Sequence, residues 1–311
     1  MFCSDMNKQG HKSTLVLGNG FDLDLGMKTT WANFKESVYW SNLVETVPSP
    51  LILFLNNNCS ARWGNVEDAL QEYATSGSHS TYDEDKKSFV ALCNSFADFL
   101  RVEVWKLSND NIGEDNMSVA QYFINHCIYR FDKVYSFNYT PLPTILNRVF
   151  EINAPGFHCE HVHGNIGFSE HSIILGIENE VDPTEDYSFL FKSYNPFYRH
   201  TELESDLLNS DEIVFFGFSF SNSDFHYFDL LFNEIINKNR RNLSLIIFDY
   251  SNDSEQRLLN QIRSHGYNID NLKQRCNYLF IPTEGGINSA NNEALFAFKA
   301  TFYERHPGLS L

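Results

Sequence analysis

One stretch near the start of the chain constrains the fold most, because an apolar run ends there in two closely spaced glycines. It reads Thr14-Leu-Val-Leu-Gly18-Asn19-Gly20-Phe21-Asp22. The apolar run predicts a buried strand that stops at Gly18, and the spacing of residues 23–34 predicts a helix after the turn. Such a junction favours anion binding, since glycines allow the backbone to approach a phosphate closely and a helix N-terminus offers free N–H groups. The alternative is a corner that binds nothing, because the third glycine of the dinucleotide fingerprint is missing.

Length and charge restrict the class of protein. The chain has 311 residues and a formal net charge of −17. This length fits one large α/β domain, or one domain with an insertion. The acidic balance repels phosphate backbones, so non-specific nucleic-acid binding is disfavoured, and residues 192–200 are the local basic exception. A single nucleotide remains a suitable ligand, because backbone amides act locally.

No signal peptide, membrane span or metal site is expected from the sequence. Residues 1–12 are polar, and no apolar run is long enough to cross a membrane, so we expect a soluble, cytoplasmic protein. The cysteines are scattered without a Cys-x-x-Cys pair, which argues against structural zinc and a disulfide framework. His158, His161 and His163 have no further partner at zinc spacing, so no metal is expected there.

Helical periodicity dominates the chain up to about residue 130, and strands alternate with helices beyond it. Apolar residues recur at spacings of three and four over residues 62–73, 84–107 and 118–129. Expected strands lie at residues 133–140, 173–176, 212–219, 243–249 and 278–282. The alternation predicts an α/β fold with a Rossmann-like, mostly parallel sheet and helices on both faces. We expect this core to comprise residues 13–34 and 131–311, and residues 35–130 to form a helical insertion or cap.

Polar residues follow four of the expected strands. They are Asn19 and Asp22, Asn138, Ser219 and Asp224, and Asp249. The carboxyl ends of parallel strands share one edge, where ligands bind, so these residues are candidates for one site. Helix capping is the alternative, because Asn, Asp and Ser are common caps. It is weaker for Asn138, since Pro141 and Pro143 disfavour a helix directly after it.

His163 is the candidate for proton transfer. Gly164 follows it, which is typical of a loop position with backbone freedom. An imidazole suits general acid–base chemistry near neutral pH. The alternative is a structural histidine that is satisfied within the core.

Together these motifs resemble the AbiH family of bacterial abortive-infection proteins, which act against bacteriophage. The resemblance spans about residues 14–232. The motifs that carry it are Gly18-Asn-Gly20-Phe-Asp22, Gly26, Thr30, Phe34, Trp63-x-x-Val66-Glu67, Phe137-Asn138-Tyr139-Thr140, His163-Gly164, Leu175-Gly176-Ile177 and Gly217-Phe-Ser219 with Asp224. The resemblance implies antiphage defence and a phage-derived trigger.

AbiH proteins in turn look similar to sirtuins and to sirtuin-like NAD-consuming defence domains. Gly18-Asn19-Gly20, the Asn138 loop and His163-Gly164 follow the order of the sirtuin Gly-Ala-Gly, Gln-Asn-x-Asp and His-Gly motifs. Gly217-Phe218-Ser219 and Asp249 stand where sirtuins have a nucleotide loop and an asparagine at the adenosine ribose. The four-cysteine zinc module and an evident peptide groove are missing. The similarity therefore implies NAD+ cleavage rather than protein deacetylation.

The implied activity is that of an NAD+ glycohydrolase, which releases nicotinamide and ADP-ribose from NAD as substrate. Asn138 would position water or the ribose, and His163 would accept a proton. Asp22 or Glu67 would stabilise the cationic ribose, and the sequence leaves open which. The residues implied to hold the nucleotide are Gly18, Asn19, Gly20, Phe21, Asp22, Gly217, Ser219, Asp224 and Asp249. The alternative functions are a nucleotide-binding sensor without catalysis and, less favoured, a nuclease. Self-association into a homo-oligomer is a further expectation.

Overall fold

The centre of the molecule is a six-stranded sheet with the order β3-β2-β1-β4-β5-β6. The computed structural model describes residues 11–58, 64–75, 81–107, 117–153, 156–167, 173–178, 185–238, 240–288 and 292–305. Every pair of neighbouring strands is parallel. The strands are β1 (Ser13–Leu17), β2 (Lys133–Ser136), β3 (Glu160–His161), β4 (Glu212–Phe216), β5 (Ser244–Asp249) and β6 (Asn277–Pro282). This sheet confirms the predicted Rossmann-like α/β class, with the switch point of a doubly wound fold between β1 and β4.

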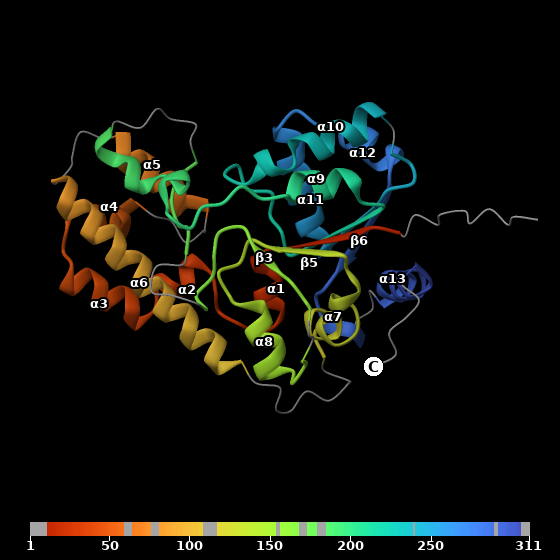
Figure 1. Cartoon of the computed structure of the whole chain (residues 1–311), viewed down its shortest axis with the longest axis horizontal. Helices are drawn as coiled ribbons and strands as arrows, with labels where there is room; N and C mark the ends of the chain where they lie inside the picture. Colours follow the sequence, from red (N-terminus) through yellow and green to blue (C-terminus); the bar gives the residue numbers. More distant parts are fainter. Residues whose placement is uncertain are drawn as a thin grey trace, which may run out of the picture.

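Helices cover both faces of the sheet, because successive strand residues point to opposite faces. In β1, Leu15 and Leu17 belong to one core and Val16 belongs to the other. The face with Leu15 is covered by α1 (Asn19–Asp24), α7 (Val119–His126), α8 (Leu142–Val149) and α13 (Asn292–Arg305). The face with Val16 is covered by α9 (Leu203–Asn209), α10 (Asp229–Lys238), α11 (Asn252–Ser264) and α12 (Ile269–Arg275), as Figure 1 shows.

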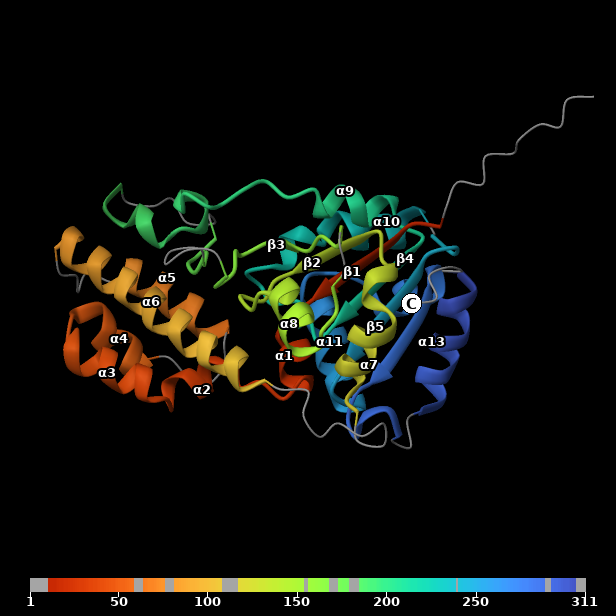
Figure 2. The ribbon, with the colours of Figure 1, turned by 60° about the horizontal axis from the view of Figure 1, so that its bottom comes forward.

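A group of helices lies beside the sheet, next to the edge at which the strands end (Figures 1 and 2). They are α2 (Trp31–Lys35), α3 (Val38–Thr46), α4 (Pro50–Asn58), α5 (Gly64–Thr75) and α6 (Tyr82–Lys106). The short helices η3 (Glu185–Leu190) and η4 (Lys192–Tyr194) return to this group from the core. The Tyr187 hydroxyl of η3 donates to Asp85 of α6 over 3.1 Å. The helical group is therefore completed by residues 185–194, which lie well beyond residue 130, where the predicted insertion ends.

Three local predictions are wrong, each for a physical reason. Residues 23–34 do not form one helix, because the chain turns at Gly26 with φ +89° and restarts at Thr30, whose side chain caps α2. A helix does follow the Asn138 loop: α8 begins at Leu142, and Pro143 is tolerated in its first turn. Residues 173–176 do not form a strand: within this range only Ile173 makes an isolated bridge, with Gly164.

Among the helices in the described part of the chain, none combines the length and the apolar character needed to cross a membrane.

Candidate functional site

The turn after β1 and the loop after β2 meet through the side chain of Asn138. Its Nδ2 donates to the Gly18 carbonyl and to Asp22 Oδ1, each over 3.0 Å. The Thr140 hydroxyl donates to Asp22 Oδ2 over 2.9 Å. Burial raises the pKa of Asp22 from 3.8 to about 7, although the hydrogen bonds from Thr140 and Asn138 oppose the rise. Asp22 therefore changes charge near neutral pH, as groups at functional sites often do.

These side chains line a small pocket at the carboxyl edge of the sheet. The lining residues are Asn19, Asp22, Thr29, Phe96, Leu100, Phe137, Asn138, Tyr139 and Thr140. The volume is about 40 Å³, which admits one or two water molecules but no nucleotide. Phe96 and Leu100 belong to α6 of the helical group. The helical group therefore contributes part of the wall of this pocket.

The glycines of the first turn pack against the turn that follows β4. The Gly20 N–H donates to the Gly217 carbonyl over 2.9 Å. A Cβ atom on Gly20 would lie 2.5 Å from Gly217 Cα, and one on Gly217, which has φ +62°, would meet the backbone of Phe21. Phe21 itself is buried, with its ring edge-on to Phe216 at 5.1 Å. The contact between the two turns thus accounts for these glycines without a phosphate.

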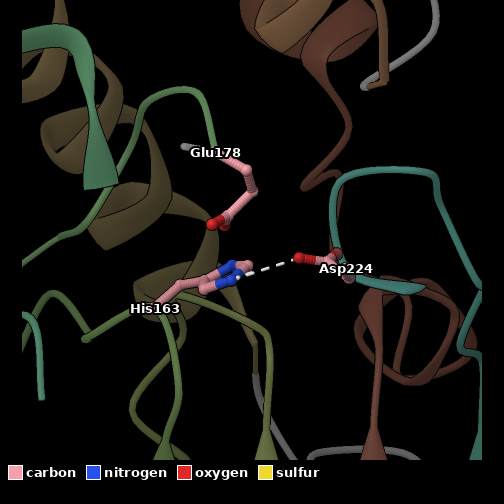
Figure 3. A group of neighbouring side chains, drawn as sticks. All are labelled: His163, Glu178 and Asp224. Atoms are coloured by element: carbon pink, nitrogen blue, oxygen red, sulfur yellow. Dashed lines mark ion pairs between the residues drawn. The ribbon is translucent and has the colours of Figure 1, made fainter. Parts of the chain in front are cut away.

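A second polar cluster surrounds the buried ammonium of Lys192, whose side chain has no exposed surface. Its Nζ lies 2.9 Å from Glu67 Oε1, 3.1 Å from Glu178 Oε1 and 3.7 Å from Asp224 Oδ1. The same oxygen of Asp224 lies 3.2 Å from His163 Nε2, as Figure 3 shows. Glu67 comes from α5, whereas His163 and Asp224 follow β3 and β4. The cluster therefore joins the helical group to the edge of the sheet.

Lys192 and Asp224 are both held in their ionised forms in this cluster. Burial alone would lower the pKa of Lys192, but Glu67, Asp224 and Glu178 hold it well above its ordinary value. Burial alone would raise the pKa of Asp224, but His163, Lys192 and a hydrogen bond from Ser221 hold it well below its ordinary value. The balance in each case comes from opposite charges at close range.

The cluster also contains a group of side chains with metal-ligand chemistry. His163 Nε2 and one oxygen each of Glu178 and Asp224 lie within 4.8 Å of one another. One imidazole and two carboxylates suit a divalent first-row metal. Lys192 already contacts both of these carboxylates and supplies a cation. His161 contacts the Asn138 carbonyl instead, and burial lowers the pKa of His161 to about 4.

The predicted site residues fall into two neighbouring groups. Asn19, Asp22 and Asn138 line the small pocket, whereas His163 and Asp224 meet in the charged cluster. Phe137 and Tyr139 flank Asn138 in the chain, and their ring centroids lie 5.2 and 6.3 Å from that of His163. Within the described residues, the side chains of Asn138 and His163 share no hydrogen bond.

Two predicted residues lie apart from both groups, and one motif residue is not described. Ser219 is exposed. Asp249 accepts a hydrogen bond from the Tyr250 N–H over 2.7 Å, and burial raises the pKa of Asp249. Neither lines the small pocket. Trp63 lies outside the described residues.

Sequence reasoning did not single out Lys192 and Glu178 as site residues. The one available signal was a lysine within the aromatic stretch after residue 189. Its position depends on backbone pairing with Ile177: the Ile177 N–H donates to the Leu190 carbonyl over 2.8 Å, and the Lys192 N–H donates to the Ile177 carbonyl over 3.0 Å. This pairing places Lys192 beside Glu178.

The fold and the site define an open α/β protein that gathers polar groups at the carboxyl edge of a doubly wound sheet, the edge at which such proteins bind ligands. The family described as "Bacteriophage abortive infection AbiH" matches residues 14–247. The chain therefore belongs to the AbiH family, and this membership indicates a function in phage abortive infection. No curated protein and no solved structure matches the chain.

Proposed function

We propose that this protein acts in phage defence by hydrolysing NAD+ to nicotinamide and ADP-ribose. The observation that supports this most is the placement of His163 3.2 Å from the partly buried carboxylate of Asp224, beside the Asn138 loop. This placement falls at the edge where doubly wound proteins bind nucleotides. A nucleotide sensor without catalysis needs no histidine paired with a buried carboxylate.

The residues match the needs of glycosidic hydrolysis. Nicotinamide leaves with the bonding electrons, and the remaining ribose carries positive charge until a water oxygen bonds to C1′. His163 would accept the proton of that water. Both hydrogen bonds from Asn138 Nδ2 are used by Gly18 and Asp22, so its amide oxygen is the group that would hold water.

The small volume of the pocket bears on control of this activity. An NAD+ molecule needs far more than the 40 Å³ present, so its binding would require a wider pocket, which displacement of Phe96 and Leu100 on α6 would provide. We propose that a phage-derived trigger acts on the helical group and opens the pocket. An enzyme that depletes NAD+ would then have only a low basal activity before infection.

The direct test measures nicotinamide and ADP-ribose by chromatography after the purified protein is incubated with NAD+. His163→Ala and Asn138→Ala should each reduce turnover roughly 100- to 10,000-fold, the range for lost acid–base assistance. The exposed His200→Ala is the matched control and should retain activity.

The same variants should be tested in infected bacteria, where any trigger is present. Cellular NAD+ should fall after infection with wild type and His200→Ala, but not with His163→Ala or Asn138→Ala. Phage protection by His163→Ala and Asn138→Ala at the wild-type level would refute hydrolysis and favour the sensor.

A further inference from the structure

The cluster around Lys192 contains more negative than positive charge. Three carboxylates, those of Glu67, Glu178 and Asp224, contact one ammonium group. The carboxylates thus outnumber the ammonium group by two. Uncompensated charge in a largely buried site is unfavourable. The cluster therefore favours the approach of a further cationic group.

Glu178 has fewer protein partners than Asp224 and is more exposed than Glu67. The described structure gives it one ionic contact, with Lys192, whereas Asp224 contacts His163 and Lys192 and accepts a hydrogen bond from Ser221. The side chain of Glu178 is 17% exposed, against 9% for Glu67. Figure 3 shows its carboxylate turned toward the ring of His163. The exposed part of the Glu178 side chain can thus face a ligand while its Oε1 contacts Lys192.

We propose that Glu178 binds the positively charged nicotinamide end of the substrate and acts as a catalytic residue. This role rests on the proposed hydrolysis of NAD+. The C1′–N bond breaks with both electrons going to nicotinamide, a water oxygen bonds to C1′, and one water proton passes to His163. Glu178 stays ionised and stabilises the ribosyl cation electrostatically. Because the reduced ring of NADH is neutral, the same carboxylate selects the oxidised dinucleotide.

The other two acidic candidates for stabilising the cation, Glu67 and Asp22, are engaged by protein groups. Glu67 is held 2.9 Å from Lys192 and is more buried than Glu178. Asp22 lies in the other group, where it is occupied by Asn138 and Thr140. Glu178 lies close to His163, and its side chain is partly exposed to solvent.

The first test compares kcat/KM for NAD+ among variants of Glu178. Glu178→Gln should lower it on the order of 100-fold, the effect of removing one group that stabilises transition-state charge. Glu178→Asp, which keeps the carboxylate, should retain most of the activity. The control Glu45→Gln removes the same charge from an exposed position on α3 and should leave activity unchanged. Wild-type activity in Glu178→Gln would overturn the role.

The second test separates the binding role from hydrolysis. Calorimetry measures binding of 1-methylnicotinamide, a cation without a glycosidic bond, and of neutral nicotinamide. Wild type and Glu45→Gln should bind the cation at least about 10-fold more tightly, and Glu178→Gln should lose this preference, a difference of about 1.4 kcal/mol. A Glu178-dependent preference without nicotinamide release from NAD+ would support the binding role and refute the proposed hydrolysis. No preference in wild type, or an unchanged preference in Glu178→Gln, would overturn the binding role.

Discussion

Replacing Lys192 by methionine tests whether the buried ammonium holds the helical group against the sheet. Methionine fills a similar volume but removes the charge that faces Glu67, Glu178 and Asp224. Each contact of about 3–4 Å contributes roughly 4–5 kcal/mol of Coulomb energy at an effective dielectric constant of about 20. Desolvation of the ions offsets much of this sum. Breaking a buried pair from one side typically destabilises by about 3–5 kcal/mol, and we expect a loss in this range.

Urea unfolding at pH 7, followed by circular dichroism, measures this loss. The matched control is Lys238→Met, which removes a surface pair with Glu234 whose lysine is 70% exposed. That variant should lose no more than about 1 kcal/mol. The double variant Lys192→Met/Glu67→Gln should be more stable than Lys192→Met alone, because it leaves one fewer buried charge without a partner.

Two results would contradict a stabilising role for the buried ammonium of Lys192. One is a loss below about 1 kcal/mol in Lys192→Met, which would mean that the carboxylates are well solvated without the ammonium. The other is a double variant less stable than Lys192→Met, which would mean that Glu67 stabilises the fold by some contact other than its pair with Lys192.

Two further predictions concern the first turn. Gly20→Ala should lower the free energy of unfolding by about 1–3 kcal/mol, because its Cβ would lie 2.5 Å from Gly217 Cα. The Cβ of Gly26→Ala meets no atom within 4 Å, so this variant should lose only the roughly 1 kcal/mol cost of its positive φ. Equal losses for the two variants in urea unfolding would contradict the contact between Gly20 and Gly217. Asp22 has a folded-state pKa raised from 3.8 to about 7, so its contribution to stability is full below about pH 3.8 and is lost as the pH rises to about 7. Asp22→Asn does not ionise, so its stability relative to wild type should rise between pH 4 and pH 7, and a constant difference across that range would show that Asp22 ionises normally.

Local patterns in the sequence predicted the class of fold. The apolar run of residues 14–17 and the later strands are bounded by turn residues, and the intervening segments repeat at helical spacing. Such patterns depend only on residues that are close in the sequence, so they can be recognised without the tertiary structure. The cap of α7 is equally local, since the Ser118 side chain accepts a hydrogen bond from the nearby Gln121 N–H.

The same local reading failed where one backbone angle decided the outcome. Residues 23–34 have helical spacing throughout, yet a positive φ at Gly26 ends α1 and starts a new direction. Pro143 reads as a helix breaker in sequence, but in the first turn of α8 its missing N–H breaks no hydrogen bond.

Only the tertiary structure assembled the charged cluster. Glu67, His163, Glu178, Lys192 and Asp224 come from separate segments, and the sheet and the helical group bring them together. The glycines that suggested a phosphate loop turned out to pack one turn against another 197 residues later, as the bond from Gly20 to Gly217 shows. Contacts of this kind depend on how distant elements pack, and no spacing within a single segment records them. The sequence could therefore indicate an edge rich in polar residues, while packing decided which of these residues form ion pairs with one another.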